Sequence, residues 1–101
     1  MPTDPVFRAH AVKDGSGGGS VTVNVPTGTV NGDLMIWYLL STGATPATPA
    51  GWNLITSATL SGGICTWWWR RALSEPASYT AGPVGGNAYY SSSIISLYVT
   101  T

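Results

Sequence analysis

The sequence is poor in charged residues, cysteine and histidine, and each shortage excludes a class of chemistry. Lysine plus arginine number four and aspartate plus glutamate number four, so 8% of the 101 residues are charged, where about a quarter is usual. A net charge of zero argues against nucleic-acid binding and against docking on anionic membranes, because both need a basic surface. The single cysteine, Cys65, excludes an internal disulfide, and one histidine leaves little for acid–base catalysis. We therefore expect no enzymatic activity, no cofactor and no metal site.

Targeting and membrane-spanning segments are also missing from the sequence. The first residues, Met1 to Pro5, show no basic start followed by an apolar run, so no secretory signal peptide is predicted. The longest dense apolar stretch, Leu34 to Leu40, is far shorter than the roughly 20 residues that a spanning helix needs.

Glycine, proline and aromatic residues are abundant instead, and their pattern predicts strands. Thirteen glycines and seven prolines interrupt the chain so often that no long window with helical periodicity survives. Short runs of alternating or continuous apolar residues lie between turns, at 6–12, 20–25, 34–40, 52–60, 64–72, near 79, and at 88–100. Seven or eight short strands at this spacing are typical of an all-β, antiparallel β-sandwich or barrel. We divide the chain into residues 1–19, an N-terminal arm or first strand with a glycine-rich loop, and a β-sandwich domain over 20–101.

Three of these strands carry large apolar side chains on both faces. The runs at 34–40, 64–69 and 94–99 lack the polar face that a sandwich strand normally presents to water. A domain of this size has one interior, so the second face must be covered, and another copy of the chain is the simplest cover. The alternative is coverage by the N-terminal strand and the loop at 42–50.

The run Trp67-Trp68-Trp69 is the strongest single feature. Successive side chains of a strand point to opposite faces, so Trp67 and Trp69 share one face and Trp68 takes the other. Such a split favours a core plus a subunit interface over a flat sugar-binding platform, because interface cores are rich in Trp, Tyr and Arg. The predicted interface set is Trp37, Trp67, Trp68, Trp69, Arg70 and Arg71. If the protein binds glycans instead, the candidates are Trp52, Tyr89 and Tyr90, which lie next to loops.

The remaining polar residues have structural interpretations. Cys65 lies mid-strand without a catalytic partner and is predicted to be a buried, inert thiol, and His10 is predicted to face solvent. Asp33 follows Gly32 in a turn, where its carboxylate can accept hydrogen bonds from the backbone amides. Arg71 and Glu75 are spaced to form a surface ion pair.

Four segments together resemble a known family. They are Gly32-Asp33-Leu34-Met35-Ile36, Pro49-Ala50-Gly51-Trp52-Asn53-Leu54-Ile55, the strand from Trp67 to Ala72, and Glu75-Pro76-Ala77-Ser78-Tyr79-Thr80. In this order they resemble a small, jelly-roll-like β-sandwich domain that occurs in virion proteins of tailed bacteriophages, among them capsid decoration proteins, tail fibres and adhesion modules.

The resemblance implies a virion structural protein, most simply a capsid decoration (cement) protein on the outer shell. Its expected partners are further copies of itself, as a homotrimer, and the major capsid protein. Its expected location is the surface of the phage particle, after synthesis in the host cytoplasm without a signal peptide. We keep a second interpretation open, in which the chain is a tail-fibre or head-fibre adhesion module that binds host glycans.

Overall fold

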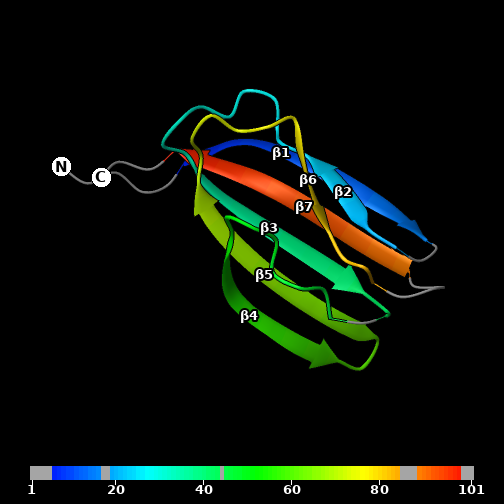
Figure 1. Ribbon diagram of the computed structural model, residues 1–101. Coiled ribbons are helices and arrows are strands. Elements are labelled where there is room, and N and C mark those ends of the chain that lie inside the picture. The colour runs from blue at the N-terminus through cyan, green and yellow to red at the C-terminus, as the bar shows by residue number, and fades with distance from the viewer. Residues whose placement is uncertain (1–5, 17–18, 44, 85–88, 99–101) are drawn as a thin grey trace.

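Seven strands and no helix make up the part of the chain that the structure describes. The computed structural model describes residues 6–16, 19–43, 45–84 and 89–98. The strands are β1 (Val6–Ser16), β2 (Val21–Asn24), β3 (Leu34–Ser41), β4 (Asn53–Leu60), β5 (Gly63–Arg71), β6 (Ser78–Ala81) and β7 (Tyr89–Tyr98) (Figure 1). The predicted all-β class with about seven strands is confirmed. These ranges contain no helix of the length and hydropathy needed to span a bilayer.

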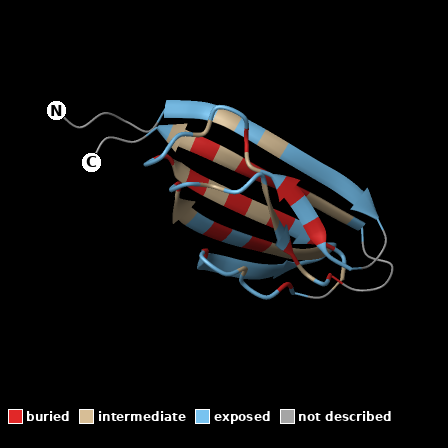
Figure 2. Ribbon diagram, turned by 45° about the horizontal axis from the view of Figure 1, so that its top comes forward, coloured by how far each residue is buried: buried red, intermediate tan, exposed pale blue. Residues whose placement is uncertain are grey.

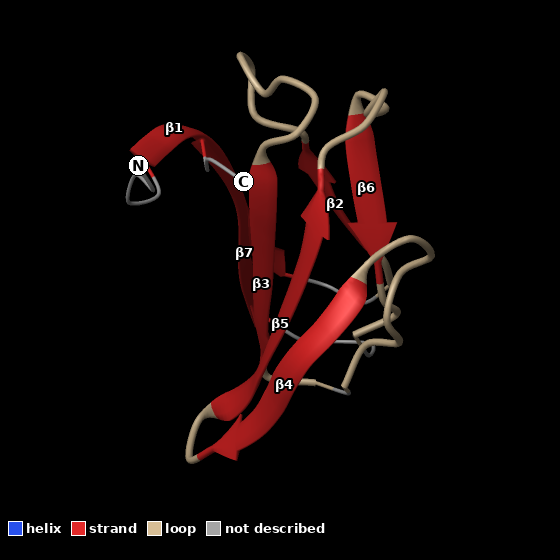
Figure 3. Ribbon diagram, turned by 90° about the vertical axis from the view of Figure 1, so that its left-hand side faces the viewer, coloured by secondary structure: helices blue, strands red, loops and turns tan. Residues whose placement is uncertain are grey.

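The strands form two antiparallel sheets of unequal size. The larger has five strands in the order β1-β7-β3-β5-β4, and the smaller pairs β2 with β6. The smaller sheet and the longer loops lie on one side of the larger sheet (Figure 3). We call that side of the five-stranded sheet its inner face, and the opposite side its outer face.

Alternation along the strands places the core between the two sheets. Met35, Trp37 and Leu39 of β3 are fully buried, as are Val21 and Val23 of β2. The intervening β3 residues are half-buried or exposed, which gives the strands of the large sheet their banded pattern in Figure 2. Period-2 alternation is what a strand with one face on a core produces. The second row of apolar residues therefore lies on the outer face.

Strand β1 belongs to the main sheet. It pairs with β7 along its whole length, from Val6 opposite Tyr98 to Ser16 opposite Tyr89. The proposed division at residue 19 therefore falls between two strands of one folded unit, and the arm expected at residues 1–5 lies outside the described residues.

A β-bulge between Phe7 and Ala9 changes the face that β1 presents. Simple alternation predicts Phe7 on the face opposite to His10, but the extra residue places both rings on the outer face, 5.8 Å apart. His10 is exposed there, as predicted.

The segment between β3 and β4 packs on the inner face. Pro46 is buried, and Thr48 accepts a hydrogen bond at 3.3 Å from the indole of Trp68, which lies on the inner face. Because β1 lies within the sheet and this loop lies inside, neither covers the outer face in the described chain. The alternative in which these two segments hide the second apolar face is therefore wrong.

Candidate interaction surface

The outer face of the five-stranded sheet carries a continuous set of apolar side chains. The pairing registers align Leu34 with Leu97, Ile36 with Ile95 and Trp69, and Tyr38 with Trp67. Phe7 and Val12 of β1 extend the row on one side, and Leu40 extends it along β3. We call these residues the outer patch: Phe7, Val12, Leu34, Ile36, Tyr38, Leu40, Trp67, Trp69, Ile95 and Leu97.

The outer patch is open to solvent, although its side chains pack against one another. The rings of Tyr38 and Trp67 lie 5.3 Å apart near its middle. Trp67 and Trp69 are 38% and 39% exposed, and Phe7 and Val12 at the rim are more than half exposed. No segment of the described chain lies over it. Aromatic residues with such exposure in one contiguous area mark an interaction surface rather than scattered surface residues.

Apart from His10 on the edge strand β1, the ionisable side chains that the described chain places on the outer face next to the patch lie at its ends. The registers place Asp14 at one end, where its carboxylate accepts a 2.7 Å hydrogen bond from Ser91, and Arg71 at the other, where its guanidinium donates to the carbonyl of Gly32 at 3.0 Å. The middle of the patch is therefore electrically neutral, and apolar burial is the force that is available to it.

The structure divides the predicted interface residues between the two faces. Trp67, Trp69 and Arg71 lie on the outer face, as the strand alternation predicts. Trp37 and Trp68 are fully buried, with their rings 5.0 Å apart. A side chain with no solvent exposure in the single chain cannot touch a partner, so both leave the candidate interface and belong to the core.

Arg70 also lies on the inner face, where it closes one end of the core. Its guanidinium pairs with Glu75 at 2.9 Å and lies over the rings of Tyr79 and Trp52. Tyr79 donates a hydrogen bond to the second oxygen of Glu75. Burial, reinforced by the hydrogen bond and the charge of Glu75, raises the pKa of Tyr79 to about 12. The predicted Arg71–Glu75 pair is thus wrong, because strand alternation gives Arg70 the face that turns toward Glu75.

Asp33 anchors the turn before β3, as predicted. Its buried carboxylate accepts a hydrogen bond from the amide of Val30 at 3.1 Å and forms a 2.7 Å ion pair with Arg8. The Arg8 contact was not anticipated, since it depends on the β1 bulge that begins at Phe7.

The three glycan-binding candidates are separated by the fold. Trp52 is 5% exposed, and its ring packs 5.2 Å from Trp37 in the core. The side chain of Tyr90 lies against Gly15 so closely that a Cβ there would meet the Tyr90 hydroxyl at 2.6 Å. Tyr89 alone is well exposed, at 69%. Trp52 therefore cannot stack on a sugar, and these three candidates do not form one aromatic platform.

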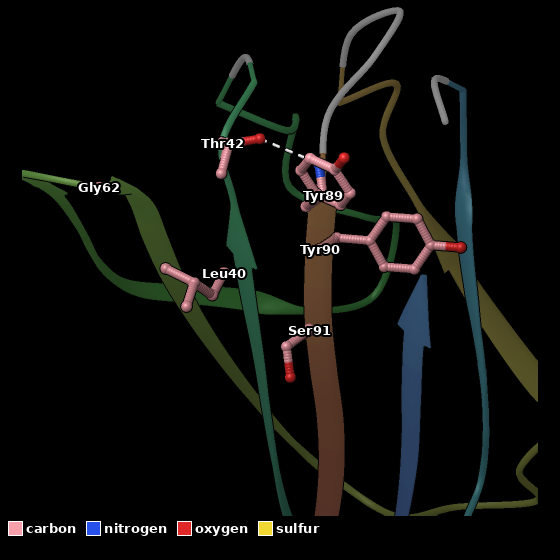
Figure 4. Close-up of a pocket in the computed structure, with 6 residues that line it drawn as sticks. All are labelled: Leu40, Thr42, Gly62, Tyr89, Tyr90 and Ser91. Carbon is pink, nitrogen blue, oxygen red and sulfur yellow. Dashed lines mark hydrogen bonds between the residues drawn. The ribbon is translucent and has the colours of Figure 1, made fainter. Parts of the chain in front are cut away.

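A shallow pocket of about 220 Å³ lies beside Tyr89 at one end of the outer face (Figure 4). Thr42 and Tyr89 hold its rim together with two hydrogen bonds, one between their main chains at 3.0 Å and one from the Tyr89 amide to the Thr42 hydroxyl at 2.9 Å. The lining residues are Leu40, Thr42, Gly62, Tyr89, Tyr90 and Ser91. Since Leu40 belongs to the outer patch, the pocket continues that surface.

No group of three or more His, Cys, Asp or Glu side chains within the described ranges is placed to hold a metal ion. Cys65 is half-buried on the outer face, opposite Leu40 and Ala58, rather than fully buried as predicted. Comparison with protein-family models, with curated proteins and with solved structures finds no significant match.

Proposed function

We propose that this chain is a non-enzymatic structural protein that associates with copies of itself through the outer patch. On the resemblance of its four sequence segments to phage virion domains, we propose that it acts as a capsid decoration protein of a tailed bacteriophage. In this role it binds the outer shell as a homotrimer and contacts the major capsid protein.

The observation that carries the proposal is the open outer patch. The outer patch spans four strands, spaced about 4.8 Å apart, and about eight residues along each strand at about 3.4 Å per residue. These dimensions give an area of about 500 Å² in the plane of the sheet. Side chains that stand out from the sheet raise the accessible area toward the roughly 800 Å² per partner of a standard interface. A surface of this size, with two tryptophans that are more than a third exposed, is large enough for a standard-size protein contact.

The neutral middle of the patch supports a second copy as the occupant. A charged side chain that is buried between copies without a partner must lose its hydration, and this opposes association. The outer patch contains none, and its two neighbouring charges lie at opposite ends of the face. The copies can therefore bury it without leaving an unpaired ion in the contact.

We further propose that the two sheets form a reduced jelly-roll-like sandwich. Three features support this: all pairings are antiparallel, three of the four neighbouring pairs in the large sheet are non-consecutive in sequence, and both sheets contribute to one core. In this arrangement the β2–β6 sheet is too narrow to cover the inner side of β4.

The proposal is tested by the oligomeric state of wild type and of Trp69→Asp. Static light scattering should give at least three times the chain mass of 10.5 kDa for wild type, and Trp69→Asp should lose the three-fold contact while it keeps the wild-type far-UV circular dichroism. Thr27→Asp, at an exposed turn residue away from the patch, is the matched control and should stay assembled. A wild-type protein that is monomeric at hundreds of micromolar contradicts self-association.

The capsid assignment needs a separate measurement. Purified phage shells stripped of decoration should recover the wild-type protein in a fixed stoichiometry on co-sedimentation, and Trp69→Asp should not be recovered. If the protein fails to bind any such shell but binds a glycan array, the adhesion interpretation takes its place.

The adhesion interpretation now depends on Tyr89 and the pocket beside it. An exposed tyrosine next to a concave surface is a suitable stacking group for one sugar ring. Glycan binding that is lost in Tyr89→Ala, with the oligomer intact, would favour this second function.

A further inference from the structure

Strand β4 is an unprotected edge of the five-stranded sheet. All eight of its residues are exposed, and among them Leu54, Ile55 and Leu60 are each more than half exposed. It pairs with β5 on one side only, and within the described ranges no other strand pairs with it. Its second row of backbone N–H and C=O groups is therefore open to another strand.

The two edges of the sheet are protected differently. Edge strand β1 contains Arg8, His10, Lys13 and Asp14, whereas β4 contains no ionisable residue and no proline. Charged residues, proline and β-bulges are the usual means by which proteins prevent edge-to-edge pairing, and of these β4 has only a bulge near its start, between Leu54 and Thr56. The edge at β1 therefore opposes the addition of a strand, and the edge at β4 permits it.

We propose that β4 pairs antiparallel with β4 of a second copy across a two-fold axis, which joins two five-stranded sheets into one. An antiparallel pair of identical strands is self-complementary, because each residue that donates to the partner also accepts from it. The absence of charge leaves no like-charge pair when the strand meets itself.

The sequence of β4 suits a symmetric centre near Ser57. Pairing centred on Ser57 places Thr56 beside Ala58 of the second copy, so small side chains meet in the middle. The exposed aliphatic residues Leu54 and Leu60 lie toward the two ends, and the β-bulge between Leu54 and Thr56 places them on opposite faces of the sheet. This contact is distinct from the outer patch, because it uses backbone groups along an edge and none of the patch residues.

The test uses opposite charges at the symmetric centre. Ser57 is exposed and faces the inner side, opposite Thr66, so substitutions there leave the outer patch untouched. Ser57→Glu alone and Ser57→Lys alone place like charges together and should weaken pairing. An equimolar mixture of the two places opposite charges together and should associate about tenfold more tightly than either alone, as measured by sedimentation velocity at low salt. Both variants lose the same Ser57–Thr66 hydrogen bond, so a gain on mixing reports contact between chains.

The Ser57 variants are measured in two backgrounds, one with the wild-type outer patch and one that also carries Phe7→Asp. Phe7 lies on β1, at the opposite edge of the sheet from β4. In the Phe7→Asp background the proposed pairing should leave a species of twice the chain mass, which Ser57→Glu should convert to monomer. Thr27→Glu and Thr27→Lys are the matched controls and should show no gain on mixing.

The two interfaces fail in different ways. If mixing the Ser57 variants gives no gain in association, β4 pairing is wrong, whatever the state of the outer patch. If the gain persists while Trp69→Asp changes nothing, β4 pairing stands and the outer-patch contact fails.

Discussion

At the scale of single residues, small polar side chains make room for the tryptophans of the core. Ser92 is fully buried, accepts a 2.8 Å hydrogen bond from the indole of Trp37, and donates one at 2.7 Å to the carbonyl of Tyr38. A buried indole N–H without a partner is costly. Ser92 therefore gives the indole N–H of Trp37 a hydrogen-bond acceptor, and its small side chain leaves space for the indole ring.

Ser92→Ala should lower the free energy of unfolding by about 1–3 kcal/mol, because it leaves the buried indole N–H of Trp37 without a hydrogen-bond acceptor. Urea denaturation monitored by tryptophan fluorescence measures the change. Ser61→Ala, at an exposed turn residue, is the control and should be within about 0.5 kcal/mol of wild type. Equal stability of the two variants would show that the Trp37–Ser92 bond contributes nothing.

Tyr79 makes stability depend on alkaline pH. Its pKa is raised to about 12 in the folded chain, against about 10 when unfolded. The folded state therefore holds a proton that the unfolded state has lost between these values. The stabilisation is complete below pH 10 and declines as pH rises toward 12, by up to about 1.4 kcal/mol per pH unit. In Tyr79→Phe this contribution to the slope should vanish in urea titrations across that range, and an unchanged slope contradicts it.

Much of the residue-level site follows from strand alternation, and the exceptions have identifiable causes. Alternation correctly separates Trp68 from Trp67 and Trp69, and the same rule, applied two residues further, would have paired Arg70 rather than Arg71 with Glu75. Burial of Trp52 is a tertiary effect, because the loop that carries it folds back over Trp37. No local sequence pattern predicts that this loop folds over Trp37.

At the scale of elements, the positions of the strands are readable from the sequence, but their partners are not. Turn residues and apolar runs locate all seven strands to within a few residues. Apart from the β4–β5 hairpin, the order β1-β7-β3-β5-β4 joins strands that are far apart in the chain, and such pairing depends on the whole core rather than on any segment. The bulge at Phe7 is similarly invisible to a period-2 pattern, yet it decides which β1 residues reach the outer face.

The turn between β4 and β5 offers a matched pair of glycines. A Cβ on Gly63 would lie 2.5 Å from the carbonyl oxygen of Ser41, whereas a Cβ on Gly62 would meet nothing within 4 Å. Gly63→Ala should therefore destabilise the chain by about 1–3 kcal/mol, since backbone must move. Gly62→Ala should be neutral or slightly stabilising. Thermal unfolding by circular dichroism compares them, and equal melting temperatures would contradict the close approach of Gly63 to β3.

At the scale of the whole molecule, a five-stranded sheet is matched by a sheet of only two strands. The smaller sheet buries the inner residues of β3 and β7 but leaves β4 exposed on both sides, and the outer patch is open as well. The sequence predicts this excess of apolar sheet surface, because three of its strands carry apolar side chains on both faces. Which face receives the loops is decided by tertiary packing.

Association through the outer patch should be insensitive to salt. The patch contains no charge, and apolar contacts are not screened by ions. Light scattering between 50 mM and 1 M sodium chloride should give the same mass for wild type. Dissociation as salt rises would point to an electrostatic contact elsewhere on the molecule.

The open face and the open edge of the large sheet lie at right angles, so a chain engaged through one keeps the other free. If both proposed contacts form, three-fold and two-fold joints link every copy to several others, and the angle between the two axes decides whether the assembly is a flat net or a closed particle.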